Sequence, residues 1–296
     1  MSVSAGTPSR GGAARVLRAP TSRIPVSVLL AGTVLAVALT VTAFAPLLMP
    51  YAYDAIDLRA RLAPPIPLEG ATWAHPLGTD KLGRDVLSRL LIATQTSIAL
   101  ALLGTLIGAV LGTVLGFLAA HFRGWVDEVI SALVDFQAAM PYFIIALAIL
   151  AFLGNSLVVF LLLMALFGWE TYARITRGLV LSAREEGYAL ALTAVGASPF
   201  RIYARHILPN ILSPLIVQLT INFPNTILFE TSLSFLGLGI RPPLTSLGQM
   251  LGDGRDYLVT AWWLAVVPGL TIFLVTLAMS IFSDWLRVRF DPSMQD

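Results

Sequence analysis

The sequence predicts an all-α integral membrane protein with six transmembrane helices. Of the 296 residues, 57% are hydrophobic and 12% are charged, whereas soluble domains carry about 25% charged residues. Six apolar runs have the length that a membrane-spanning helix needs, roughly 17–25 residues. Arginines gather around one polar segment between two of these runs, which is typical of the cytoplasmic side of a membrane.

The composition excludes several kinds of chemistry. The chain has no cysteine, so it has no disulfide, thiolate metal site or cysteine nucleophile. The net charge of +2 is too small to indicate a nucleic-acid partner. His75, His121 and His206 are far apart and lack the spacing of metal ligands. No serine lies in a nucleophile-elbow motif, so we expect neither a catalytic nor a metal site.

The chain begins with a basic stretch that precedes the first apolar run. Residues 1–23 are rich in Gly, Ser and Ala and contain four arginines and no acid, which predicts a disordered cytoplasmic tail. A signal peptide is the alternative, because a basic region also precedes the apolar core of a signal. The run Ile24–Leu48 is too long for such a core, and this favours an uncleaved first span with its basic end in the cytoplasm.

Residues 51–90 are polar, proline-rich and balanced in charge, so we place them outside the membrane. Gly78 and Gly83 predict tight turns. Arg84, Asp85 and Arg89 are expected to open a helix that leads into the second span. An ordinary amphipathic loop helix is the alternative interpretation of this stretch.

Five further apolar runs complete the predicted membrane domain, residues 24–286. They are Ser97–Ala120, Val129–Phe152, Leu157–Ala173, Ile207–Leu236 and Ala261–Phe282. Six spans place both termini on the same side, so residues 287–296 form a cytoplasmic tail and residues 237–260 an outer loop. Prolines within several runs predict bending, because a freed backbone carbonyl must find another partner inside the protein.

The segment Leu181–Pro209 is the long polar stretch around which the arginines gather. Its first half predicts a short helix. Ser182 is expected as the N-cap, with Glu185 and Glu186 in the first turn, where the helix dipole favours acids. Gly196 then predicts a hinge, because glycine accepts positive φ without strain.

The second half of this segment predicts another short helix. Ser198 is expected to cap it, and Pro199 occupies the favoured first helical position. Arg201 and Arg205, four residues apart, would share one face. Pro209 marks the return to apolar sequence.

Three separated segments resemble a known family. Gly196, Leu208-Pro209 and Ala191 fit the EAA-loop pattern of ABC importer permeases, although leucines stand at the flanking positions of its Glu-Ala-Ala. The segment His75–Leu91 and the stretch Leu233–Gly239, followed by Pro242-Pro243, continue the match. Together these segments resemble the dipeptide/oligopeptide/nickel branch, in the form of its second permease subunit.

The resemblance implies a type I ABC importer permease fold in the bacterial cytoplasmic (inner) membrane. The implied partners are a homologous permease, two ATP-binding subunits and an extracytoplasmic substrate-binding protein. ATP and Mg would bind to the partner subunits. Lys81, the one lysine of the chain, is not followed by the Ser or Thr of a phosphate-binding P-loop, so we expect no cofactor on this chain.

The same resemblance implies that residues 181–209 couple the membrane domain to the ATPase subunits. The residues assigned to this contact are Glu185, Glu186, Tyr188, Ala191, Gly196, Arg201, Arg205 and Pro209.

Polar residues inside the apolar runs are candidates for the translocation pathway. The candidates are Asp135, Asn222, Asn225 and Glu230, and Glu170 is a further acid within a span. A charged group facing lipid would cost roughly 2.5–3.5 kcal/mol, so we expect the acids to face the bundle or a cavity. Hydrogen bonding between helices is the alternative role for these residues.

The function expected from these observations is that of a permease subunit for short peptides. The alternative within the same machinery is import of nickel complexes or another small solute. The alternative of another class is an ion-coupled secondary transporter that uses Asp135 or Glu230. Transporters of that class often contain internal repeats, and none is visible in the sequence.

Overall fold

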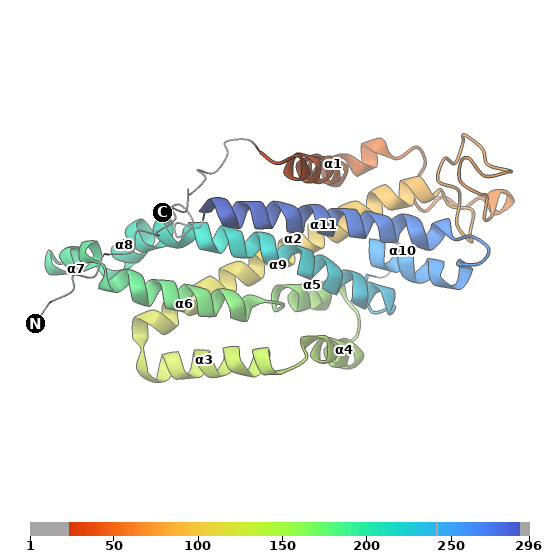
Figure 1. Ribbon diagram of the computed structural model, residues 1–296. Coiled ribbons are helices and arrows are strands. Elements are labelled where there is room, and N and C mark those ends of the chain that lie inside the picture. The colour runs from red at the N-terminus through yellow and green to blue at the C-terminus, as the bar shows by residue number, and fades with distance from the viewer. Residues whose placement is uncertain (1–23, 241, 291–296) are drawn as a thin grey trace, which may run out of the picture.

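The computed structural model describes residues 24–240 and 242–290, without the side chains of Leu190 and Thr193. The predicted basic tail, residues 1–23, and the last six residues of the predicted C-terminal tail lie outside the described residues. The described part is built from helices, and the long helices α2, α6, α9 and α11 run side by side along roughly one direction (Figure 1). This confirms the all-α fold class.

The helices follow one another from α1 to α11, with three short helical turns between them. Their bounds are α1 (Val26–Leu48), η1 (Leu58–Ala60), α2 (Val86–Phe122), α3 (Gly124–Ala139), α4 (Tyr142–Leu153), α5 (Leu157–Ala165), α6 (Trp169–Glu185), α7 (Gly187–Ala194), α8 (Pro199–Ile202), η2 (Tyr203–Ile207), α9 (Leu208–Phe235), α10 (Leu247–Gly254), η3 (Arg255–Tyr257) and α11 (Trp263–Phe290). We call the end of the bundle that carries α7 and α8 the α7 end, and the opposite one the α10 end (Figure 1).

Five stretches of the described residues are long and apolar enough to cross a membrane, and a bent pair of helices makes a sixth. The five are α1, α2, α5 with α6, α8 with α9, and α11, and the pair is α3 with α4. The third predicted span, residues 129–152, is therefore not one straight helix. α3 and α4 meet at 92°, because Met140 precedes Pro141 and is extended (φ −94°, ψ 138°), as a residue before proline prefers.

The fourth span is longer than predicted. α5 ends at Ala165, and α6 begins after Gly168, whose φ is +83°. α6 then continues to Glu185, well beyond the predicted end of the span at Ala173. Its buried face, which includes Tyr172, Thr176 and Val180, explains why the helix persists through a stretch whose polar residues suggested a loop.

Four glycines of α2 allow α5 and α6 to approach its backbone. Gly104, Gly108, Gly112 and Gly116 recur every fourth residue and so share one face of the helix. A Cβ at Gly112 would lie 2.2 Å from the Trp169 carbonyl oxygen, and those at Gly108 and Gly116 would each lie 2.6 Å from another carbonyl. Small residues at this spacing are typical of close helix packing in membranes.

At the α10 end, the segment before α2 folds over the bundle. The tight turns predicted at Gly78 and Gly83 are confirmed, with φ of +77° and +74°. Asp85 caps α2 by accepting from the Ser88 backbone N–H at 2.7 Å. α10 packs against α2, α9 and α11, and its N-terminal Leu247 N–H donates to the Ser97 hydroxyl of α2 at 3.0 Å.

At the α7 end, half of the predicted helix caps are correct. Gly196 has φ of +78°, and the Ser198 hydroxyl accepts from the Arg201 N–H at 3.4 Å, so the predicted hinge and second cap are confirmed. The cap predicted at Ser182 is wrong, because α6 runs through this residue. The break comes at Glu186, which is extended (φ −69°, ψ 144°).

The second helix of this segment was predicted to be short, but it continues without a break into the fifth span. α8, η2 and α9 form one continuous helical stretch, Pro199–Phe235. η2 is a π-helical turn in which the Leu208 N–H donates to the Tyr203 carbonyl. Pro209 follows directly, as the second residue of α9, and donates no backbone N–H to the turn before it.

Candidate functional site

The eight residues that the sequence assigns to ATPase coupling lie at the α7 end, and all are exposed. They flank or belong to α7, α8 and the start of α9 (Figure 1). Two apolar residues that the sequence analysis did not single out lie among them: Val195 is 79% exposed and Phe200 is 81% exposed. The sequence did contain a signal for Val195 and Phe200, because large apolar side chains beside a predicted hinge in a polar segment are typical of a contact surface.

Contacts with α2 and α6 fix this segment to the bundle. Ile202 and Ile207 are buried in a cluster with Ala120, Tyr172 and Val180. A 2.9 Å hydrogen bond joins His121 Nδ1 at the end of α2 to the Tyr203 hydroxyl. The segment with α7, α8 and η2 is therefore held against α2 and α6 by buried side chains, while its other side stays exposed.

Further hydrogen bonds tie the two sides of the segment together. Arg184 donates to the Ala120 carbonyl at 2.9 Å, which joins the end of α6 to α2. The Asn210 amide donates to the Tyr188 hydroxyl at 3.3 Å, which joins α9 to α7. The predicted coupling residue Tyr188 thus also helps to hold α7 in place.

Glu230, a predicted pathway residue, is completely buried. Its carboxylate accepts from the Ser234 hydroxyl at 2.7 Å and is also hydrogen-bonded by Ser97 of α2, Ser246 before α10 and Thr231. The carboxylate therefore joins α9, α2 and the start of α10, and it presents no accessible surface to a passing solute in this structure.

We expect Glu230→Leu to weaken the α10 end of the bundle. Leucine removes an acceptor shared by hydroxyl groups of three segments, and each buried polar group left without a partner costs about 1–3 kcal/mol. The thermal midpoint of the detergent-purified protein, followed by size-exclusion chromatography after heating, should fall. Glu230→Gln keeps one acceptor oxygen and should fall less. A leucine variant as stable as the parent would show that the hydroxyl groups do not depend on this carboxylate.

Asn222 and Asn225, predicted to line the same route, lie three residues apart on α9 and differ in burial. Asn222 is buried, and its amide nitrogen lies 2.6 Å from where a Cβ of Gly168 would be. Asn225 is exposed and donates to the Ile221 carbonyl at 3.3 Å. Asn222 is thus enclosed within the chain, whereas Asn225 reaches the surface of α9.

The two remaining acids within the spans, Asp135 and Glu170, have partners across the contact between α3 and α6. Arg174 of α6 approaches Asp135 of α3 at 3.4 Å. The Gln137 amide donates to Glu170 at 3.1 Å. Asp127 of α3 forms a third link, an ion pair with Arg177 of α6. The sequence analysis did not identify Arg174 or Arg177 as partners of acids on α3.

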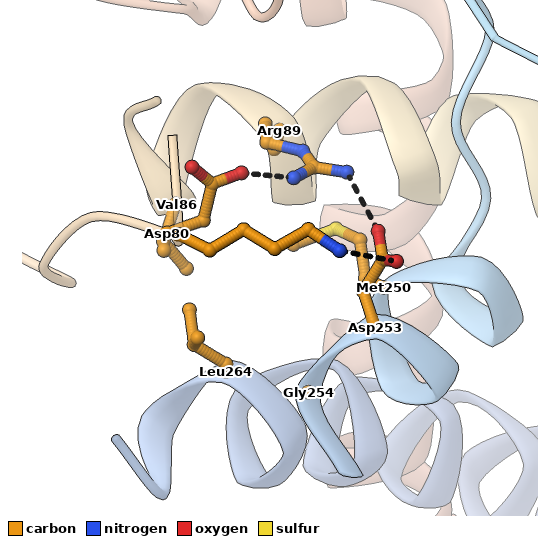
Figure 2. A pocket seen from close by; sticks show the side chains of 8 residues that line it. Asp80, Val86, Arg89, Met250, Asp253, Gly254 and Leu264 are labelled. Carbon is orange, nitrogen blue, oxygen red and sulfur yellow. Dashed lines mark hydrogen bonds and ion pairs between the residues drawn. The ribbon is translucent and has the colours of Figure 1, made fainter. Parts of the chain in front are cut away.

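At the α10 end, charged residues from distant parts of the chain form one cluster (Figure 2). Asp80 is hydrogen-bonded by Arg89 of α2 and, at 2.7 Å, by Arg84. Lys81 contacts Asp253 of α10 at 3.3 Å, and Arg89 contacts the same carboxylate at 3.6 Å. The cluster thus links the segment before α2 to α10.

Opposite charges hold this cluster together. Burial raises the pKa of Asp80, but Arg89, the Arg84 and Leu82 backbone N–H groups and the Arg84 side chain together hold that pKa below its ordinary value. The carboxylate therefore stays ionised at neutral pH. A cavity of about 20 Å³ lies among these residues, enough for roughly one water molecule. A second cavity, of about 240 Å³, is lined in part by Lys81, Arg84, Arg89 and Asp253.

Comparisons with known proteins identify the family. Residues 112–296 match the family described as the binding-protein-dependent transport system inner membrane component. The chain is 37% identical over 253 residues to the di/tripeptide transport system permease protein DppC of Pseudomonas aeruginosa, covering 86% of this chain and 84% of that one. It is 35% identical over 227 residues to the glutathione transport system permease protein GsiD of Pectobacterium atrosepticum, covering 77% and 75%.

A solved structure supports the fold. A chain of the MetNI methionine ABC transporter, in an inward-facing conformation, covers 68% of this chain and 95% of its own length, with a TM-score of 0.53 and 21% sequence identity. This similarity shows a shared permease fold.

The family also confirms the expected division of labour. In ABC transporters ATP binds to the ATPase subunits, and the permease component is a non-catalytic, multi-pass protein of the inner membrane. The resemblance seen in three separated segments of the sequence is confirmed over most of the chain. The chain belongs to the family of binding-protein-dependent transport system inner membrane components, the permease subunits of ABC importers.

Proposed function

We propose that this chain forms one half of the translocation pathway of an ATP-driven importer of short peptides. The supporting observation is its 37% identity, over 86% of its length, to a permease named for di/tripeptide transport. The complete importer would contain a homologous permease, two ATP-binding subunits and an extracytoplasmic substrate-binding protein. Family membership argues against the ion-coupled secondary transporter.

A second candidate substrate is glutathione, itself a tripeptide. The support is the 35% identity to a permease named for glutathione transport. Nickel complexes and other small solutes, the alternative raised by the sequence, have no comparable support among these relatives. Both favoured candidates are short peptides with free termini.

In this proposal the α7 end lies in the cytoplasm. Arg184, Arg201 and Arg205 belong to the end of α6, to α8 and to η2 at that end of the bundle, as the positive-inside rule requires. The start of α1 and the end of α11 lie toward the same end (Figure 1), which suits cytoplasmic termini. Residues 51–90 and 237–260 would then face the extracytoplasmic side.

The exposed surface of α7 and α8 would enter a cleft of an ATPase subunit. Val195 and Phe200 would become buried there, which explains apolar side chains that are otherwise exposed at the end of the molecule. The coupling residues around them would supply the polar rim of the contact.

The test is transport by the complete complex in proteoliposomes. We expect uptake of radiolabelled dialanine and trialanine with ATP, and no uptake without the ATPase subunits or with a non-hydrolysable ATP analogue. Glutathione tests the second candidate in the same assay. Uptake driven by an ion gradient without ATP, or uptake of a nickel complex with no uptake of peptide, would contradict the proposal.

A further inference from the structure

The contact between α3 and α6 contains two ion pairs of different character. Arg177 donates two hydrogen bonds to Asp127, at 2.5 and 2.6 Å, and Ser131 donates a third to the same carboxylate at 3.3 Å. Asp135 and Arg174 touch through one guanidinium nitrogen at 3.4 Å. Their side chains are 76% and 59% exposed, so this pair is far more open than a structural bridge.

An exposed ion pair on a membrane-spanning helix cannot face lipid cheaply. A charge at the centre of the bilayer costs roughly 2.5–3.5 kcal/mol on insertion scales, so this surface must face water or another subunit. A hollow of about 220 Å³ adjoins the pair, and its lining includes Ser131, Asp135, Arg174 and Arg177. Both helices thus present charge to a recess that has room for a small polar group.

The geometry of the pair suits exchange with a solute. An exposed ion pair contributes only about 0–1 kcal/mol, so separating it costs little. Contact through one nitrogen leaves other guanidinium N–H groups available to a planar carboxylate, which arginine binds through two parallel hydrogen bonds. A translocation pathway must bind its solute weakly enough to release it again, and an exposed ion pair of this kind meets that requirement.

The substrate class of the proposed function carries the complementary charges. A peptide with free termini has one ammonium and one carboxylate group at neutral pH. Asp135 and Arg174 offer one anion and one cation side by side. Arg177 cannot offer the same, because Asp127 already accepts from two of its nitrogens.

We propose that Arg174 and Asp135 contact the substrate in the translocation pathway, with Arg174 binding the terminal carboxylate of a passing peptide and Asp135 its terminal ammonium. The inference rests on the proposed function of peptide import. It adds Arg174 to the pathway and gives Asp135 a defined chemical role.

The absence of cysteine from this chain permits a direct test. Arg174→Cys would be made in a complex whose other subunits have been freed of cysteine. Dialanine uptake should fall at least about tenfold, because the charge-assisted hydrogen bonds of the guanidinium to the carboxylate are lost. Reaction of the thiol with aminoethyl methanethiosulfonate, which restores a positive charge, should recover uptake, whereas the sulfonatoethyl reagent should not. Added dialanine should slow both reactions.

Two control positions separate this role from others. Arg255 forms an ion pair with Asp256 at 3.3 Å, and the two side chains are 58% and 74% exposed, so Arg255→Cys should react without protection by dialanine. Leu133 of α3 is 53% exposed, and Leu133→Cys should react poorly, because the apolar neighbours of this residue suit a lipid-facing surface.

Two results would overturn the inference. If the thiol of Arg174→Cys is unreactive while that of Arg255→Cys reacts, this surface lies against the partner permease. If the thiol of Arg174→Cys reacts but dialanine does not protect it, and uptake is independent of the charge of the reagent, the peptide termini do not bind there. If the unmodified complex imports no peptide, the proposed function itself fails, which is a separate result from either of these.

Discussion

Replacing Gly112 with leucine should prevent the normal assembly of the bundle. A Cβ at this position would lie 2.2 Å from the Trp169 carbonyl oxygen and 2.7 Å from the Tyr172 Cβ, so α2 and α6 would have to separate. Overpacking commonly costs about 1–3 kcal/mol and more when the backbone must shift, against a total stability of roughly 5–15 kcal/mol. We expect little monodisperse protein after extraction in mild detergent, measured by fluorescence-detected size-exclusion chromatography.

A glycine on the opposite helix provides the control. Gly178 of α6 has nothing within 4 Å of an added Cβ, so Gly178→Leu should yield protein at parental levels. Gly112→Ala should be intermediate, because it adds the Cβ alone. A Gly112→Leu variant with a normal profile and thermal midpoint would mean that the two helices are not packed this closely.

The second large effect is expected from Gly196→Val. The φ of +78° at this residue is strongly disfavoured for a β-branched side chain, and left-handed backbone costs other residues about 1–2 kcal/mol. No atom lies within 4 Å of an added Cβ, so the effect is conformational and should change the direction of α8 relative to α7. We expect normal membrane levels, weak co-purification with the ATPase subunits and little substrate-stimulated ATP hydrolysis.

The same segment contains a matched control glycine. Gly187, at the start of α7, also has open space around an added Cβ but no positive φ, so Gly187→Val should retain coupled ATP hydrolysis. Gly196→Asn should retain more activity than the valine variant, because asparagine tolerates the left-handed region. Native coupling by Gly196→Val would show that the hinge does not orient the two helices.

The sequence predicted the helices well where one local feature decides the structure. Apolar length determined the spans, and Gly196 and Ser198 indicated a hinge and a cap that the structure contains. The predictions failed where packing overrides a local preference. Ser182 has a side chain that could cap a helix, but α6 continues through it because the helix buries residues on both sides of this position.

The roles of polar residues within the spans depend on contacts that periodicity does not encode. Glu230 and Asp135 look alike in sequence, since each is a lone acid in an apolar run. In the structure Glu230 is enclosed by hydroxyl groups from three segments, whereas Asp135 is 76% exposed beside Arg174. The difference arises from the relative register of neighbouring helices, which no single stretch of sequence specifies.

The π-helical turn Tyr203–Ile207 determines the angular phase between the two ends of a long helix. An α-helix advances about 100° per residue, and a π turn accommodates one residue more than an α turn. This extra residue therefore sets which face of α9 carries Asn225 and which carries Glu230, relative to the exposed face of α8. Deleting or inserting one residue in this turn would rotate the whole of α9 about its axis relative to α8, the segment proposed to contact the ATPase.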